Sequence, residues 1–269
     1  MKEKIVAAIQ MTSGNDKIGN LNKAQKLLEK GVSTGAGILA LPENFSFMGS
    51  ADAEKLQNAE DPEGGPSLDF LKNFSKKHGV WLIGGSIPVK ADGGKVFNRT
   101  YVVGSDGEIA AHYDKIHLFD VQIPGGESHK ESERVEAGKE VVTCKTPFGT
   151  VGLSICYDLR FTELFRLLAM KGANMVFVPS AFTKKTGEAH WEILLRARAI
   201  ENQFYVIAPA QTGDHNSKRS TYGNSMIVDP WGKVLSRAGD EETVITAGID
   251  DGYLSLVRRS IPCLDHRRL

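Results

Sequence analysis

Cys156 is the residue of this 269-residue chain whose setting most favours covalent chemistry. The apolar run Thr150–Cys156 predicts a strand that ends at the cysteine, and a helical pattern begins soon afterwards, near Thr162. A side chain at such a strand-to-helix turn is presented at the edge of the sheet, where the following backbone N–H groups can bind an oxyanion. A single cysteine at the end of an apolar strand is more often a packed small hydrophobe, and we assign Cys144 and Cys263 to that role.

A cysteine nucleophile needs a base and a positive charge, because a free thiol is only slightly ionised at neutral pH. The residues leave two arrangements open. In one, Cys156 pairs with a histidine, and the candidates are His117, His190 and His215. In the other, Glu43 is the base and Lys115 is the fixed cation, since Glu43 lies at the end of an apolar strand and Lys115 lies just past a strand. Glu43 or Lys115 alone would more often be a solvated loop charge, but three strand-end residues of complementary type favour a shared site.

Several familiar chemistries are disfavoured by the order of the residues. The glycine-rich segment Gly31–Gly37 follows a helical pattern and precedes a strand, which is the reverse of a phosphate-binding loop. His190-Trp191-Glu192 lacks the Cys-x-x-Cys partner of a zinc deaminase, and the three cysteines lack metal-ligand spacing. No Gly-x-Ser-x-Gly occurs in the sequence, so a serine hydrolase is unsupported. We therefore predict no metal site.

The elements that must position these residues alternate between strands and helices. Apolar β-branched runs predict strands over 5–11, 37–41, 80–88, 100–103, 150–156, 175–178, 204–209, 225–228 and 243–249. Several of these runs are apolar on both faces, which is typical of strands covered on both sides. Helical periodicity predicts helices over 20–31, 66–78, 162–171 and 190–202. Hairpin signals at 105–107 and 229–232 indicate a mixed sheet in an α/β fold rather than a parallel barrel. The long polar loops Gly49–Gly65 and Gly125–Gly138 are typical of loops that serve a site.

Composition limits the partners that this chain can have. Lys and Arg number 33 and Asp and Glu also number 33, so no charge excess favours nucleic acid or an anionic membrane. No apolar run reaches the roughly 18 residues that a membrane span needs. The first residues lack a signal-peptide pattern, and three widely spaced cysteines fit a reducing compartment. We expect a cytoplasmic protein in which residues 1–269 form a single domain.

Three separated motifs together resemble the catalytic blocks of the nitrilase superfamily of carbon–nitrogen hydrolases. They are Leu41-Pro42-Glu43-Asn44, Tyr113-Asp114-Lys115-Ile116-His117-Leu118 and Ile155-Cys156-Tyr157-Asp158-Leu159-Arg160-Phe161. The resemblance keeps the family's order and spacing over nearly the whole chain. It implies a four-layer α-β-β-α sandwich that needs no metal or cofactor. It also implies that Glu43 is the general base, Lys115 the oxyanion-stabilising cation and Cys156 the nucleophile.

The same resemblance implies further site residues. The backbone N–H of Tyr157 is expected to be the second oxyanion donor. A second glutamate is expected in the loop after the lysine, where Glu131 is the best match and Glu127 is a weaker rival. Many relatives carry proline where this chain has Thr162, and a threonine there is consistent with capping the N-terminus of the following helix.

Two later segments, 179–202 and 210–226, resemble the branch that holds deaminated-glutathione amidases and omega-amidases, and the second resembles the former more closely. The resemblance implies a small 2-oxo-acid amide as substrate, with deaminated glutathione cleaved to 2-oxoglutarate and Cys-Gly as the leading expectation. Substrate carboxylates need cations, and the candidates are Arg160, Lys218 and Arg219. Each of these is explained equally well by surface pairing with an aspartate. Phe182 is expected to be a further substrate-binding residue.

Other functions remain open at this point. An omega-amidase acting on 2-oxoglutaramate or 2-oxosuccinamate would release ammonia, and nitrile or N-carbamoyl hydrolysis is less favoured by these segments. A catalytically idle binding module is a further alternative, although the intact Glu43, Lys115 and Cys156 argue against it. The resemblance also implies a homodimer or higher homo-oligomer, formed through the helices beside the cysteine, with the C-terminal tail, about 253–269, in the contact.

Overall fold

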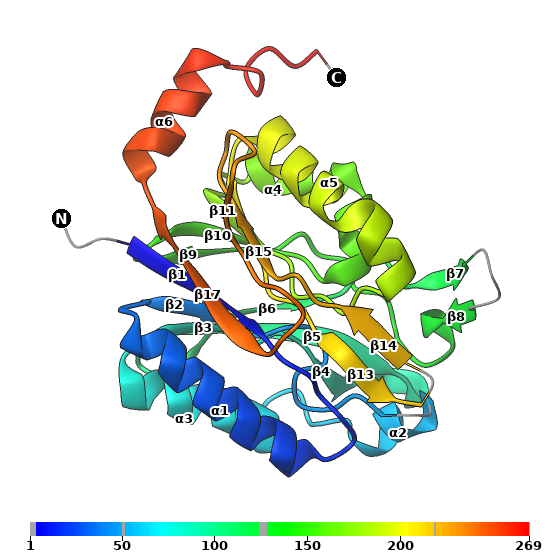
Figure 1. Ribbon diagram of the computed structural model, residues 1–269. Helices are drawn as coiled ribbons and strands as arrows, with labels where there is room; N and C mark the ends of the chain where they lie inside the picture. Colours follow the sequence, from blue (N-terminus) through cyan, green and yellow to red (C-terminus); the bar gives the residue numbers. More distant parts are fainter. Residues whose placement is uncertain (1–3, 50–51, 124–127, 218, 269) are drawn as a thin grey trace.

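Two mixed β-sheets pack face to face, and helices cover the outer face of each (Figure 1). The computed structural model describes residues 4–49, 52–123, 128–217 and 219–268. The strands of the first sheet are, in spatial order, β17 (Thr243–Ile249), β1 (Lys4–Gln10), β2 (Ile38–Ala40), β3 (Trp81–Ile83), β5 (Val96–Val103) and β4 (Ile87–Lys90), with β6 (Ile109–Asp114) also paired to β5. The strands of the second sheet are β16 (Val234–Arg237), β15 (Met226–Val228), β12 (Tyr205–Ala208), β11 (Met175–Phe177), β10 (Gly149–Leu153) and β9 (Thr143–Thr146).

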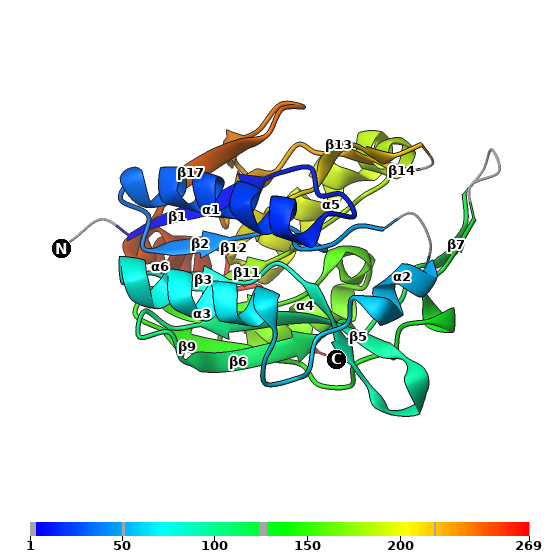
Figure 2. The same ribbon diagram turned by 90° about the horizontal axis from the view of Figure 1, so that it is seen from below.

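The helices complete a four-layer arrangement. Helices α1 (Lys17–Ser33) and α3 (Pro66–His78) lie on the outer face of the first sheet, and α4 (Thr162–Met170) and α5 (Lys184–Asn202) lie on that of the second (Figures 1 and 2). The expected α-β-β-α sandwich is therefore confirmed. None of the described helices is long and apolar enough to cross a membrane.

Smaller elements surround one end of the sandwich or close the chain. Two hairpins lie outside the main sheets, formed by β7 (Asp120–Gln122) with β8 (Ser128–Lys130) and by β13 (Thr212–Asn216) with β14 (Arg219–Tyr222). The short helices are α2 (Asp52–Gln57), α6 (Asp251–Ser260) and the 3-10 turns η1 (Asp92–Gly94), η2 (Glu131–Glu133) and η3 (Cys156–Arg160).

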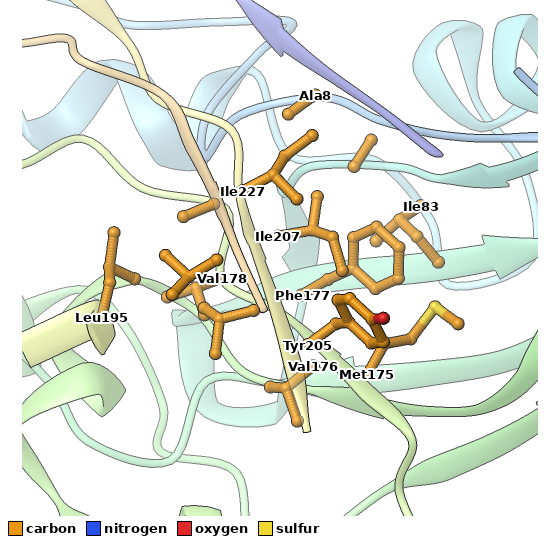
Figure 3. Close-up of a cluster of buried hydrophobic side chains, with 14 of the residues drawn as sticks. Ala8, Ile83, Met175, Val176, Phe177, Val178, Leu195, Tyr205, Ile207 and Ile227 are labelled. Atoms are coloured by element: carbon orange, nitrogen blue, oxygen red, sulfur yellow. The ribbon is translucent and has the colours of Figure 1, made fainter. Parts of the chain in front are cut away.

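The main hydrophobic core fills the space between the two sheets. Ala8 and Ile83 of the first sheet belong to the same buried cluster as Phe177, Ile207 and Ile227 of the second (Figure 3). A second cluster lies between the first sheet and helices α1 and α3. Strands with a core on each side must be apolar on both faces, which explains the uninterrupted apolar runs in the sequence. Each large side chain buried here contributes about 1.5–3 kcal/mol relative to an exposed one.

Strand direction brings distant parts of the chain to one edge. Strands β1, β2 and β3 are parallel, β5 is antiparallel to β3, and β6 is antiparallel to β5. Strand β6 therefore runs in the same direction as β2, and the residues that follow β2 and β6 emerge at the same end of the sheet. In the second sheet β10, β11 and β12 are parallel.

The structure corrects several predictions of individual elements. The run 80–88 is two strands, β3 and β4, separated at Gly84–Ser86, because Gly85 takes a left-handed φ of +56°. Helix α2 lies inside the predicted loop 49–65, and α6 lies in the tail treated as a contact segment. Thr162 does not cap α4, because Phe161 occupies the N-cap position and the Thr162 hydroxyl donates to Glu201 Oε1 at 2.9 Å.

Gly85 supports a fold prediction, because a β-carbon built on it would lie 2.2 Å from the carbonyl oxygen of Pro42. Gly79 is a matched control, since its φ of +65° is similar and its β-carbon would meet nothing within 4 Å. We expect Gly79→Ala to lower the free energy of unfolding by about 1 kcal/mol through backbone strain alone. Gly85→Ala adds the clash and should lower it by roughly 2–4 kcal/mol, as measured by urea denaturation. Equal losses for the two variants would show that the close approach of Gly85 to Pro42 has no energetic weight.

Candidate active site

Glu43 is held in a turn that ends strand β2. Pro42 has no N–H to continue the strand ladder, and Asn44 takes a left-handed φ of +56° while its N–H donates to Ser86 Oγ at 2.9 Å. These constraints turn the Glu43 side chain inward, where only 3% of the residue is exposed. A buried carboxylate requires partners for its charge and its oxygens.

Lys115 and Asn98 supply those partners. Lys115 Nζ lies 3.0 Å from Glu43 Oε1 and 2.8 Å from Glu131 Oε2, and 2% of the lysine is exposed. The side-chain amide of Asn98 donates to Glu43 Oε1 at 2.9 Å and to Glu131 Oε1 at 3.3 Å. One ammonium and one amide therefore join two carboxylates that lie 88 residues apart in the sequence.

The charges in this network determine each other's protonation. Burial alone would lower the pKa of Lys115, but the charges of Glu131 and Glu43 outweigh it and hold that pKa well above its ordinary value. Burial alone would raise the pKa of Glu131, but Lys115, Lys55 and the N–H of Phe119 together lower it to about 2. Lys115 is therefore a permanent cation and Glu131 a permanent anion at neutral pH.

Cys156 begins η3 directly after the end of β10. Its φ of +49° is unusual for a residue with a side chain, and its N–H donates to the Pro179 carbonyl at 2.9 Å. Strained backbone of this kind is typical of functional turns. Burial raises the pKa of the Cys156 thiol well above its ordinary value, and the charge and hydrogen bond of Glu43 act in the same direction, while Lys115 opposes them. The thiol is thus protonated at rest, with a hydrogen-bonded carboxylate to which it can transfer its proton.

Asp158 fixes the turn that presents Cys156. This fully buried carboxylate accepts hydrogen bonds from the Ile155 N–H at 2.8 Å, the Tyr113 hydroxyl at 2.7 Å and the His117 N–H at 3.0 Å. Because Tyr113 and His117 flank Lys115 in the sequence, Asp158 ties the lysine segment to the cysteine turn. This role of Asp158 had not been predicted.

The three histidine candidates are engaged elsewhere. His117 Nδ1 lies 2.7 Å from Asp158 Oδ1, and its ring stacks on Phe161 at 3.6 Å. His190 Nδ1 lies 3.3 Å from a guanidinium nitrogen of Arg160. The His215 ring contacts the Ser13 carbonyl and the Thr221 hydroxyl, and burial lowers its pKa to about 4. None of the three lines the cavity at Cys156, so the geometry favours Glu43 over these three histidines as the partner of the cysteine.

A cavity of about 130 Å³ opens onto Cys156, Glu43, Lys115 and Glu131. Of the other expected site residues, Tyr157, Arg160, Phe182 and Arg219 also line it. Glu127 and Lys218 lie outside the described residues. In the described part of the chain, no three His, Cys, Asp or Glu side chains gather in a way that could hold a metal ion.

Two residues at this site, Lys55 and Asn98, had not been predicted. Lys55 lines the cavity from α2, a helix too short to give a periodic apolar pattern. Asn98 lies within strand β5, which is buried almost continuously, so no alternation along that strand marks the amide.

The fold and this site define a hydrolase of carbon–nitrogen bonds, and the chain belongs to the carbon–nitrogen hydrolase family, whose sequence model matches residues 5–259. It is 44% identical over 271 residues to the deaminated glutathione amidase of Synechocystis sp., with 99% of both chains covered. It is 40% identical over 263 residues to the omega-amidase NIT2 of Danio rerio, with 98% of this chain and 94% of that one covered. The solved structure of Saccharomyces cerevisiae Nit3, a member of branch 10 of the nitrilase superfamily, has a TM-score of 0.90 and 33% identity, covering 99% of this chain and 97% of that one. The resemblance to the nitrilase superfamily is therefore confirmed.

The low pKa of Glu131 predicts how stability depends on pH. A carboxylate whose pKa falls from 4.5 in the unfolded chain to about 2 in the folded one stabilises the fold above pH 4.5 and loses that effect as the pH falls towards 2. We expect Glu131→Gln to be less stable than wild type by roughly 2–3 kcal/mol at pH 6, with a gap that narrows between pH 4.5 and pH 3 in urea denaturation. Glu133→Gln is the matched control, because among the described residues that exposed side chain pairs only with exposed Lys130. A gap that stays constant with pH would contradict the assigned ion pair.

Proposed function

We propose that this protein hydrolyses the amide of deaminated glutathione, giving 2-oxoglutarate and Cys-Gly through a thioester on Cys156. The observation that carries the proposal is the placement of the Cys156 thiol beside the buried Glu43–Lys115 ion pair in a cavity rich in cations. The 44% identity to a deaminated glutathione amidase over the full chain supports this choice of substrate.

In the proposed reaction, Glu43 accepts the proton of Cys156 as the sulfur attacks the amide carbonyl carbon. Lys115 and the N–H of Tyr157 stabilise the oxyanion of the tetrahedral intermediate. Protonated Glu43 then gives its proton to the leaving nitrogen, the C–N bond breaks, and Cys-Gly departs from a thioester. Glu43 next takes a proton from a water molecule as its oxygen attacks the thioester carbonyl carbon. The C–S bond then breaks, protonated Glu43 returns its proton to the departing sulfur, and 2-oxoglutarate leaves the restored Cys156 thiol.

The remaining predicted residues position and enclose the substrate. Glu131 holds Lys115 through a 2.8 Å ion pair and leaves the ammonium facing the cysteine. The guanidinium of Arg160 lies 5.8 Å from the Tyr157 ring centroid and 5.4 Å from that of Phe182, which orients the charge along the cavity wall. Arg160 in this position is suited to bind a substrate carboxylate.

An omega-amidase reaction on 2-oxoglutaramate is the second candidate. It uses the same residues and the same thioester, and the 40% identity to omega-amidase NIT2 supports it. The two reactions differ only in the amine that leaves, which is Cys-Gly in one and ammonia in the other. Nitrile and N-carbamoyl hydrolysis receive no comparable support, and membership of a hydrolase family disfavours an idle binding module.

We further propose a cytoplasmic homodimer built from single-domain subunits. All three cysteines are free thiols, which suits a reducing compartment. Large apolar side chains are exposed on α4 and α5, at Leu167, Met170, Ile193 and Ile200, and such a patch is typical of an interface. The exposed Leu256 and Ile261 would extend this surface into the C-terminal segment.

The proposed reaction predicts that Cys156→Ala abolishes turnover of deaminated glutathione, by at least about 1,000-fold, because no thioester can form. Cys144→Ala is the matched control, since it removes another buried thiol and should keep activity close to wild type. The measurement is release of 2-oxoglutarate, Cys-Gly and ammonia from deaminated glutathione and from 2-oxoglutaramate. Activity of Cys156→Ala within tenfold of wild type would refute the nucleophile. Faster ammonia release from 2-oxoglutaramate than Cys-Gly release from deaminated glutathione would establish the second candidate instead.

A further inference from the structure

The cavity at Cys156 contains two cations that the proposed reaction does not use. Lys55 reaches it from α2, and Arg219 reaches it from the start of β14, so the two come from elements on separate parts of the chain. Both residues are half-buried. Within the described residues, neither makes an ion pair or a hydrogen bond through its side chain.

The cavity as a whole has a surplus of positive charge. The described lining residues include two carboxylates, Glu43 and Glu131, and five cations, Lys55, Lys115, Lys130, Arg160 and Arg219. Lys130 pairs with Glu133 outside the cavity at 3.5 Å. Four cations then face two carboxylates, so these side chains have a net charge of +2. Transfer of a proton from Cys156 to Glu43 does not alter this balance.

The positive charge of Lys55 is disfavoured mainly by burial. Burial lowers the pKa of Lys55, and the charges of Arg219 and Lys115 add to this, while Glu131 and Glu43 oppose it. Glu131 cannot compensate fully, because its oxygens already bind Lys115, Asn98 and the N–H of Phe119. An anion between Lys55 and Arg219 would relieve both the repulsion and the missing solvation, and it would bind through charge-assisted hydrogen bonds.

We propose that Lys55 and Arg219 form a carboxylate-binding site that makes the enzyme selective for amides with two carboxylates. This inference rests on the proposed amidase function and bears on the choice between its two candidates. Arg160, on the η3 turn, serves one substrate carboxylate, and the Lys55–Arg219 site serves the other. Deaminated glutathione has two carboxylates, on its 2-oxo acid and on its glycine, whereas 2-oxoglutaramate has only one. The surplus of two charges therefore matches the former.

Three substrates that differ by one carboxylate test the proposal. They are deaminated glutathione, its C-terminal amide, which lacks the glycine carboxylate, and 4-oxopentanoyl-Cys-Gly, in which a methyl group replaces the 2-oxo-acid carboxylate. We expect Lys55→Gln and Arg219→Gln each to lower kcat/KM for deaminated glutathione roughly 10- to 100-fold, mainly through KM. The same variants should lower kcat/KM for only one of the two monocarboxylate substrates, namely the one that retains the carboxylate to which Lys55 and Arg219 bind.

Lys130→Gln is the matched control, because Lys130 lines the same cavity but already pairs with Glu133. This variant should change kcat/KM for each of the three substrates by no more than about threefold. Equal losses on all three substrates, or no loss on any, would overturn the carboxylate site.

If wild type released no Cys-Gly at all, the proposed function would fail separately. The site would then be tested by the protection of Cys156 from iodoacetamide by glutarate. Protection that is weaker in Lys55→Gln than in Lys130→Gln would support the site, and equal protection would refute it.

Discussion

The ammonium of Lys115, buried between the carboxylates of Glu43 and Glu131, is the interaction on which the site depends. A charge that is 2% exposed is stable only with close partners, and Lys115 has two, at 3.0 and 2.8 Å. Removing either carboxylate would leave the buried ammonium with a single carboxylate partner. The same ion pairs keep Lys115 charged beside Cys156, so the interaction that makes burial tolerable also provides the electrostatic environment for catalysis.

The rest of the fold brings Glu43, Lys115 and Cys156 to one place. Strands β2 and β6 run in the same direction in the first sheet, which places Glu43 and Lys115 at the same end. Cys156 comes from the second sheet, where its left-handed backbone is fixed by the Pro179 carbonyl and by Asp158. Asp158 also binds Tyr113 and the His117 backbone, and this contact between the two sheets sets the separation of the cysteine and the lysine.

Much of this arrangement could be predicted from the sequence because it follows from local patterns. Helix α3 and strand β17 have the predicted bounds, and Glu43, Lys115 and Cys156 were recognisable because each was expected at or just past the end of a strand and within a motif of the family. The residues alone left the choice between glutamate and histidine as the base open, because His117 is placed by a tertiary contact with Asp158, and only the family resemblance favoured Glu43. Lys55 and Asn98 were missed for a related reason. Lys55 lies in a six-residue helix and Asn98 within a strand, so neither has a sequence signal of function.

The most direct test is the rate at which iodoacetamide alkylates Cys156 between pH 5 and pH 10, mapped by mass spectrometry, in wild type and in Glu43→Gln. We expect the alkylation rate of the wild type to level off in the neutral range, because Glu43 accepts the thiol proton during attack. In Glu43→Gln the rate should keep rising with hydroxide concentration beyond pH 9, because burial holds the pKa of the thiol above its ordinary value of 9.0. Identical pH profiles for the two proteins would contradict the central claim that Glu43 ionises Cys156 beside Lys115.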